Sequence, residues 1–209
     1  MTFNSRKEAL AVIGGLSEPS KMPCYGYSLP AQACIMGAKL RTIQGSVCSK
    51  CYALKGRYVF KKVKTALERR ISTINNPRWV PAMIHLIKGQ KYFRWHDSGD
   101  IQSLQHLYNT AQIAKATPET THWLPTREYQ IVKEFCNVYN VPKNLIIRLS
   151  AMLVNGPAPE ALARELKVYV SGVSKGEAFN CPASLQEGKC MDCRACWDKK
   201  VFNVTYKSH

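Results

Sequence analysis

Long hydrophobic segments are absent from the sequence. Its apolar stretches are short, as at 145–147 and 168–170, whereas a membrane-spanning helix needs about 20 apolar residues. The first residues carry Arg6 and Lys7 ahead of a brief apolar patch at 9–13, with no small-residue cleavage site, which does not match a secretory signal. We therefore expect a protein with no membrane partner that resides in the cytoplasm.

Acidic residues are also scarce. The chain has 14 Asp and Glu against 30 Lys and Arg, so its formal net charge is +16. Such an excess predicts attraction to a polyanion or to a small anionic substrate. In segment 50–70 the one acid is Glu68, and Tyr52, Tyr58 and Phe60 lie between the cations. This composition suits nucleic acid, whose phosphates and bases would meet cations and rings, but a solvated helix face explains it equally well, so nucleic acid is a partner that we do not favour.

Several catalytic fingerprints are missing. The sequence contains neither a Gly-x-Gly-x-x-Gly run nor a Walker A motif, which excludes a nucleotide cofactor bound by those loops. A serine nucleophile elbow is absent as well. No internal repeat is present, so a repeat architecture is excluded.

Alternating strand and helix patterns indicate an α/β fold. Four short segments rich in aromatic and branched residues are predicted to be strands, at 92–96, 121–124, 144–149 and 167–170. Apolar residues at helical spacing predict helices at 104–111, 131–139 and 159–166. Parallel strands joined by crossover helices follow, whereas a closed eight-stranded barrel needs about 250 residues. The predicted architecture is a partial (β/α) barrel or an open, mostly parallel sheet.

The chain is long enough for one packed domain. Its 209 residues are 45% hydrophobic, which supports a single core. We expect one domain over 1–209, with a cysteine-rich segment at 20–60, the α/β core at 90–175 and a second cysteine-rich segment at 178–200.

Polar residues follow the predicted strands. In parallel α/β folds the strands end at a common carboxyl edge, where ligands bind. Candidate catalytic residues at this edge are His96, Asp97, Asp100, Arg127 and Arg148. The histidine could act as an acid or base, and the arginines suit a carboxylate or phosphate. Turn formation, helix capping and structural packing are the alternative roles of these residues.

Eight of the nine cysteines form two sets of four outside the predicted core. In a reducing compartment such sets indicate metal ligands more than disulfides. Three of the C-terminal set, Cys190, Cys193 and Cys196, share one tight loop, and Cys181 stands before a proline nearby. Repeated Cys-x2-Cys spacing with a Cys-Pro partner is typical of [4Fe–4S] loops. Zinc is the alternative, although it more often takes two separated pairs.

The N-terminal set is spaced more loosely. It consists of Cys24, Cys34, Cys48 and Cys51, and its spacing suits zinc nearly as well as iron. The following residues include Tyr52 and Arg57, which are candidates for shielding and compensating an anionic cluster. The ninth cysteine, Cys136, falls on the apolar face of a predicted helix, where a free thiol packs as a small hydrophobe.

Several motifs resemble the bacteriophage gene product 88 family. They are Lys21-Met22-Pro23-Cys24, Ser28-Leu29-Pro30-Ala31, Cys34, Cys48-x2-Cys51-Tyr52-Ala53, Gly56-Arg57-Tyr58, His96-Asp97-Ser98-Gly99-Asp100, Thr126-Arg127-Glu128 and the terminal cysteines. This resemblance covers almost the whole chain. It implies a cysteine-rich, iron–sulfur character and residence in the host cytoplasm, and it implies no settled activity.

A weaker resemblance connects the chain to radical S-adenosylmethionine enzymes, which also join an early cysteine cluster to a partial barrel. The Cys-x3-Cys-x2-Cys motif of those enzymes is missing, and Cys48-x2-Cys51 matches only its second half. If Cys34, Cys48 and Cys51 bound three irons, the fourth could take an exogenous ligand, whereas Cys24 as a fourth ligand would close the site for electron transfer.

The sequence as a whole favours an iron–sulfur protein with one or two [4Fe–4S] clusters. Its role would be redox or radical-type chemistry on a small anionic ligand, or electron exchange with a redox partner. Whether the chain is an enzyme stays open. The alternatives are a zinc-stabilised basic module that binds nucleic acid, and metals that serve only as structural staples.

Overall fold

The fold was analysed in a computed structural model, which describes residues 3–176 and 180–208. Residues 178 and 179 of the expected C-terminal cysteine-rich segment lie outside the described residues. The strands are β1 (Gly26–Tyr27), β2 (Tyr92–Trp95), β3 (Thr121–Thr126), β4 (Leu145–Ser150), β5 (Tyr169–Ser174) and β6 (Asn203–Lys207). The α-helices are α1 (Arg6–Ile13), α2 (Ile35–Leu40), α3 (Lys61–Thr73), α4 (Trp79–Ile87), α5 (Leu104–Ala116), α6 (Tyr129–Val138) and α7 (Glu160–Glu165).

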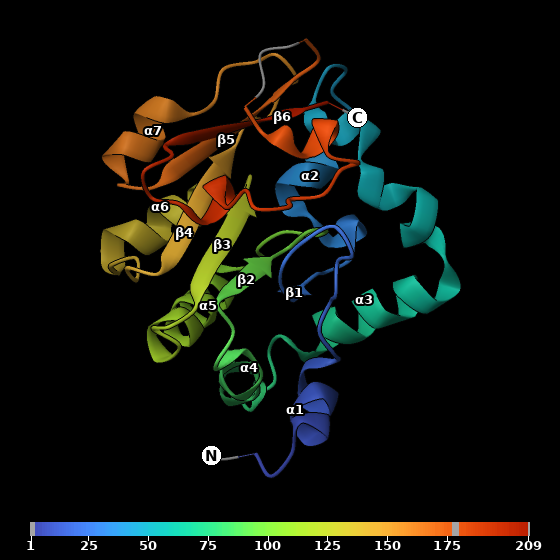
Figure 1. The fold of residues 1–209 in the computed structure, drawn as a ribbon, viewed down its shortest axis with the longest axis vertical. Coiled ribbons are helices and arrows are strands. Elements are labelled where there is room, and N and C mark those ends of the chain that lie inside the picture. The colour runs from blue at the N-terminus through green and yellow to red at the C-terminus, as the bar shows by residue number, and fades with distance from the viewer. Residues whose placement is uncertain (1–2, 177–179, 209) are drawn as a thin grey trace.

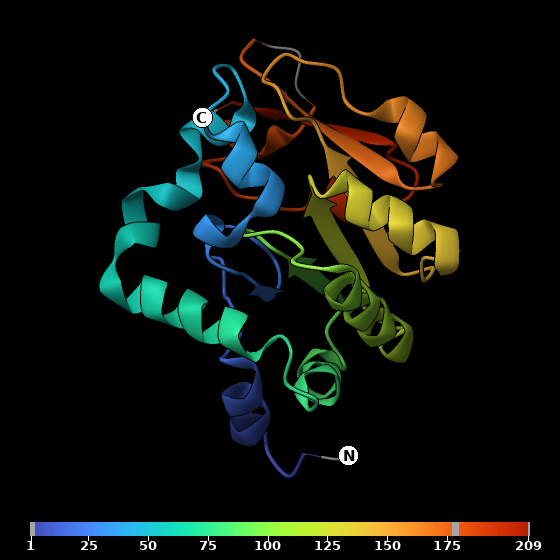
Figure 2. The same ribbon diagram turned by 180° about the vertical axis from the view of Figure 1, so that it is seen from behind.

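The six strands form one open sheet in the order β1-β2-β3-β4-β5-β6, and every neighbouring pair is parallel. This confirms the predicted α/β class, with the sheet entirely parallel and not closed into a barrel. Consecutive parallel strands joined by right-handed crossovers place their helices on one side of the sheet. Helices α5, α6 and α7 accordingly cover a single face, which is nearest the viewer in Figure 2.

The helices on this face follow the predicted pattern. Helix α5 begins behind Ser103, whose side chain accepts a hydrogen bond from the main-chain N–H of His106, as a helix N-cap does. Its Leu107, Ala111 and Ala114 are buried in the main core. Strand β4 is buried along its whole length, which is typical of a central parallel strand covered on both sides.

The opposite face of the sheet is covered by irregular segments that carry the cysteines. A separate hydrophobic cluster lies there, built on Trp123, Trp197 and Val204 with Cys196. Figure 1 shows the C-terminal segment passing in front of the sheet on this side, with α2 beside the carboxyl ends of the strands. We call this the cysteine face.

No helix among residues 3–176 and 180–208 is long and apolar enough to cross a membrane. The sequence predicted strands β2 to β5 but neither edge strand. Strand β1 has only two residues, and β6 follows the last cysteine, where no helix separates it from the irregular segment.

Candidate metal centres

The segment that carries Cys34, Cys48 and Cys51 is attached to the carboxyl edge of the sheet. Past the end of β4, the N–H of Val47 donates to the main-chain oxygen of Met152 at 2.9 Å, and the N–H of Val154 donates to Gly45, also at 2.9 Å. These main-chain bonds fix the loop before Cys48 against the end of β4. The cysteines are thereby placed where parallel α/β folds bind their ligands.

Helix α2 attaches the same segment to the end of β3. Its residue Met36 donates a main-chain hydrogen bond to Oε1 of Glu128 at 2.8 Å. Glu128 is 5% exposed and immediately precedes α6. The carboxylate therefore lies at the N-terminus of α2, next to Cys34, where the exposed N–H groups favour negative charge.

Cys34, Cys48 and Cys51 are neighbours, and we call them the three-cysteine group. Gly37 shows how close two of them are, since a Cβ placed there would lie 3.5 Å from Sγ of Cys34 and 3.8 Å from Sγ of Cys48. The pKa of the Cys34 thiol is raised to about 12, mainly by burial and also by the charges of Asp100, Cys48 and Cys51.

Cys24 lies with the C-terminal cysteines instead of with this group. It packs, together with Cys181, against the cluster that contains Cys196. The pKa of the Cys24 thiol is raised to about 12, mainly by burial, and among the nearby charges Arg94 acts to lower it and Cys190 to raise it. The main-chain N–H of Cys190 also donates to the oxygen of Lys21 at 3.0 Å, which brings the two segments side by side.

The remaining thiols complete a five-cysteine group on the cysteine face. Burial raises the pKa of Cys190, and the charges of Cys181 and Cys193 raise it further. Cys196 is 8% exposed, and its Sγ lies 3.2 Å from the hydroxyl of Tyr206 on β6. The five-cysteine group comprises Cys24, Cys181, Cys190, Cys193 and Cys196, so the structure groups the cysteines as three and five where the sequence suggested four and four.

The thiols are close neighbours without being at metal-bonding distances. In the described ranges, no set of three or more His, Cys, Asp or Glu side chains is positioned to hold a metal ion. Their chemistry nevertheless fits an iron–sulfur cluster or zinc, because both bind thiolate sulfur. Burial raises the pKa of Cys48 and of Cys181. A bound metal would lower the pKa of such thiols and deprotonate them.

Two of the predicted catalytic residues flank the three-cysteine group. Asp100 is 7% exposed and accepts hydrogen bonds from the Thr126 hydroxyl at 2.6 Å and the Arg127 N–H at 3.0 Å. Arg127 donates from Nε to the oxygen of Ala151 at 3.0 Å. Burial raises the pKa of Cys48, and the positive charge of Arg127 opposes this rise. Asp100 thus joins the ends of β2 and β3, and Arg127 carries positive charge beside a thiol.

Asp97 and His96 point in different directions. The Asp97 carboxylate accepts from the Tyr58 hydroxyl at 2.8 Å, and its main-chain oxygen accepts from the Tyr52 hydroxyl. His96 is 4% exposed, has a backbone φ of 54°, and neither ring nitrogen has a hydrogen-bond partner. Burial holds the pKa of this histidine well below its usual range, and its ring packs against His106, with 5.3 Å between centroids.

Arg148 does not face the carboxyl edge, contrary to the expectation that it would bind an anion there. Its side chain is fully buried on the cysteine face. Its three nitrogens donate to main-chain oxygens of Ala195, Cys196, Asp198, Val201, Phe202 and Val170 at 2.8–3.2 Å. Arg148 therefore holds the C-terminal cysteine segment against the sheet. Arg57, predicted to lie beside a cofactor, is exposed.

Sequence reasoning missed Arg94, Tyr206 and the anchoring role of Glu128. Arg94 and Tyr206 belong to strands whose alternate side chains face the cysteines. A polar or aromatic residue between buried neighbours, as in Phe93-Arg94-Trp95, was the signal that could have identified Arg94. The partners of Glu128 come from a distant segment and left no local signal.

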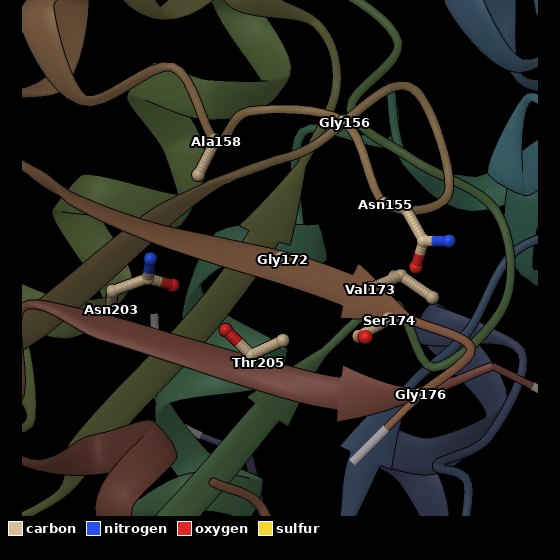
Figure 3. Close-up of a pocket in the computed structure, with 9 residues that line it drawn as sticks. All are labelled: Asn155, Gly156, Ala158, Gly172, Val173, Ser174, Gly176, Asn203 and Thr205. Atoms are coloured by element: carbon tan, nitrogen blue, oxygen red, sulfur yellow. The ribbon is translucent and has the colours of Figure 1, made fainter. Parts of the chain in front are cut away.

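A cavity of about 440 Å³ is lined by residues that include no cysteine. Figure 3 shows it between β5, β6 and the loop after β4. Gly172 and Thr205 line it, and they alternate along their strands with Val173 and Val204, so they belong to the helix-covered side of the sheet. Within the described residues, β5 and β6 are connected by two short 3-10 helices, Pro182–Leu185 and Ala195–Trp197, and by no α-helix.

Comparison with known protein families matched residues 2–199 to the family described as Gene product 88. No curated protein matched the chain, and no solved structure matched it.

Proposed function

The chain belongs to the gene product 88 family, and on that premise we propose that it is an iron–sulfur protein with two [4Fe–4S] sites. The three-cysteine group would bind one cluster at the carboxyl edge of the sheet. The five-cysteine group would bind the other on the cysteine face. The observation that supports this proposal is the division of eight cysteines into two separate groups, each with at least three neighbouring thiols.

The three-cysteine group suits a cluster that reacts with a ligand. Four-iron clusters normally take four thiolates, so three leave one iron free for an exogenous group, and the bound cluster supplies one-electron chemistry. Arg127 lies beside Cys48 and would attract a small anion. Asp100 holds the main chain of Arg127 in position. The proposed role is therefore redox or radical-type chemistry on a small anionic ligand.

The five-cysteine group suits a closed site for electron transfer. It has enough thiols to saturate four irons, and Trp123 and Trp197 pack beside it. Their 5.1 Å centroid separation and edge contact make a compact apolar wall. Such a wall limits the access of water to a cluster, which is one determinant of its reduction potential.

Metal and sulfide analysis after anaerobic purification tests this proposal. The wild-type chain should be brown and contain about eight irons with matching acid-labile sulfide, as two four-iron clusters require. Cys34→Ser leaves two thiols in the three-cysteine group, and Cys190→Ser, Cys193→Ser and Cys196→Ser together leave two in the five-cysteine group, so each of these two variants should retain about half of the iron and sulfide. Cys136→Ser, on α6 away from both groups, is the matched control and should retain all. A colourless protein with stoichiometric zinc and no sulfide would overturn the proposal.

A second candidate function rests on the exposed basic surface around α3. Phe60 is 62% exposed, and the neighbouring exposed cations are Lys55, Arg57, Lys61, Lys62, Lys64 and Arg69. Such a surface suits single-stranded nucleic acid, and in this alternative zinc would stabilise the module. Binding to a labelled oligonucleotide should then weaken steeply with salt, because bound counterions are released. Absence of salt-sensitive binding would remove this candidate.

A further inference from the structure

Arg94 occupies the centre of the cysteine face. It lies on β2, between Phe93 and Trp95, which point into the main core. Its side chain therefore points to the other side of the sheet. There its guanidinium stacks over the ring of Trp123, 4.4 Å from the centroid, and Trp123 is directly opposite it on β3.

The positive charge of Arg94 has no ion-pair partner among the described residues, where the ion pairs involve Arg78, Arg164 and Lys189. Its Nη1 donates to the thioether sulfur of Met22 at 3.1 Å, and a thioether is a weak acceptor. Its Nε is buried without a hydrogen-bond partner. Even partial burial of a cation is costly unless an anion compensates it.

The groups around Arg94 are thiols, two tyrosines and the carboxylate of Asp97, and the negative charge of that carboxylate raises the pKa of Arg94. Its charge acts on Cys24, Cys190 and Cys196 of the five-cysteine group. Trp123, on which it stacks, belongs to the same hydrophobic cluster as Cys196, and Cys24 packs against that cluster. On the other side it is hydrogen-bonded to Tyr52. Asp97 forms no ion pair with Arg94 among the described residues, so a cluster held by these cysteines would add negative charge beside a cation that the carboxylate compensates only from a distance.

We propose that Arg94 is the countercharge of the metal cluster bound by the five-cysteine group. This role rests on the proposed iron–sulfur function. A [4Fe–4S] core of charge about +2 with four thiolates carries about −2, and this anion would compensate the guanidinium. Arg94 does not bind metal itself: it positions charge beside the cluster and tunes its reduction potential.

The sign of the tuning follows from charge. An electron delivered by dithionite adds one negative charge to the site. A fixed cation nearby stabilises the reduced state, which carries this extra charge, more than the oxidised state. Arg94 therefore raises the reduction potential of this cluster. It also links cluster binding to folding, since the metal-free chain holds a half-buried cation that the loaded chain compensates more fully.

The test uses the full chain carrying Cys34→Ser, which leaves the five-cysteine site as the one occupied centre. Redox titration followed by electron paramagnetic resonance should give a lower reduction potential for Arg94→Met than for the parent. Arg94→Lys keeps the charge and should give a potential closer to the parent. Arg164→Met is the matched control, because Arg164 stacks on Phe202 at 4.3 Å away from the cysteines, and it should leave the potential unchanged.

A stability measurement separates this role from simple packing. Arg94→Met should lower the free energy of unfolding of the loaded chain and leave that of the metal-free chain equal or higher. Equal losses in both forms, or an unchanged potential with the cluster present, would overturn the proposal while leaving the iron–sulfur function intact. Wild-type protein that binds neither iron nor sulfide would overturn both.

Discussion

Two arginines on the cysteine face differ in how their hydrogen bonds are satisfied. Arg148 is saturated, since its nitrogens donate to six main-chain oxygens, whereas Arg94 has a buried Nε without a partner. Burial lowers the pKa of Arg148, and nearby Tyr206 and Cys196 raise it. An arginine whose hydrogen-bond donors all have acceptors stabilises a fixed structure, whereas one with a donor left over can still bind a ligand.

Arg148→Met should destabilise the chain and release the C-terminal cysteine segment. Six carbonyl oxygens would each lose one donor, although those of Ala195, Asp198 and Phe202 keep a main-chain donor. Unsatisfied buried groups cost about 1–3 kcal/mol each before relaxation, so we expect a total loss of about 3 kcal/mol or more. Arg148→Lys supplies fewer donors and should lose an intermediate amount. Urea unfolding measures the loss, and limited proteolysis should show earlier cleavage after Arg194. Unchanged stability in Arg148→Met would contradict the anchoring role.

Gly99 provides a second prediction at the level of one residue. Its φ is 78°, and a Cβ there would lie 2.6 Å from Cβ of Leu29 and 2.8 Å from its main-chain oxygen. Gly99→Ala should therefore lower the free energy of unfolding by about 2–3 kcal/mol, from backbone strain and the steric clash. Gly89→Ala is the matched control, because Gly89 has a φ of 83° with nothing within 4 Å, and it should lose less in thermal unfolding. Equal losses would remove the close contact as the cause.

At the level of elements, local periodicity predicted the central sheet and its helices. Strands β2 to β5 and helices α5 and α6 bury regular faces, so their patterns are present in the sequence itself. The short strand β1 has no pattern of its own, and it forms because its main chain pairs with β2. Helix α2 is similar, since Glu128 supplies a distant acceptor for its first turn.

The cysteine groups were only partly predictable from the sequence. Motif spacing identified the cysteines as candidates but could not divide them, because Cys24 and Cys34 are brought to different places by the path of the chain through β1. Cys24 precedes this strand and Cys34 follows it. A ten-residue separation along the chain therefore carries no information on which thiols become neighbours.

Glu128 gives a prediction at the level of elements. Glu128→Ala removes the acceptor for the N–H of Met36, and we expect a loss of about 1–3 kcal/mol from the orphaned group. The attachment of α2 should weaken, so iron in the three-cysteine site should fall while iron in the five-cysteine site is retained. Glu165→Ala, exposed on α7, is the control. Full iron content in Glu128→Ala would show that α2 keeps its position without this bond.

For the whole molecule, the charge and the cysteines are connected. The net charge of +16 counts the thiols as neutral. Two clusters of charge about −2 each would reduce it to about +12, and Arg94 and Arg127 lie where that negative charge would form. The exposed cations around α3 are not compensated in this way, so they remain the feature that favours a polyanion.

Three buried histidines set the response of the whole fold to acid. Burial lowers the pKa of His106 to about 4 and of His122 to about 3, and holds that of His96 well below its usual range. His122 shows the reason, since its Nδ1 accepts from Trp95 Nε1 at 3.3 Å and its Nε2 lies 2.9 Å from the Thr117 hydroxyl. A proton on Nδ1 would place two hydrogen-bond donors, this N–H and the indole N–H, against each other.

The free energy of unfolding should therefore fall as pH drops below about 6.5, the pKa of an unfolded histidine. In this range the unfolded chain binds protons that the folded chain does not, so each histidine contributes a slope approaching about 1.4 kcal/mol per pH unit. The loss from His106 and His122 continues until about pH 4 and about pH 3. Burial raises the pKa of Asp100. This shift has the opposite effect on stability and offsets part of the slope below neutral pH.

Urea unfolding followed by tryptophan fluorescence between pH 7.5 and 5 measures the slope. His122→Gln should reduce it, whereas the exposed His85→Gln is the control. A slope that His122→Gln leaves unchanged would show that this histidine is not kept neutral by its two partners.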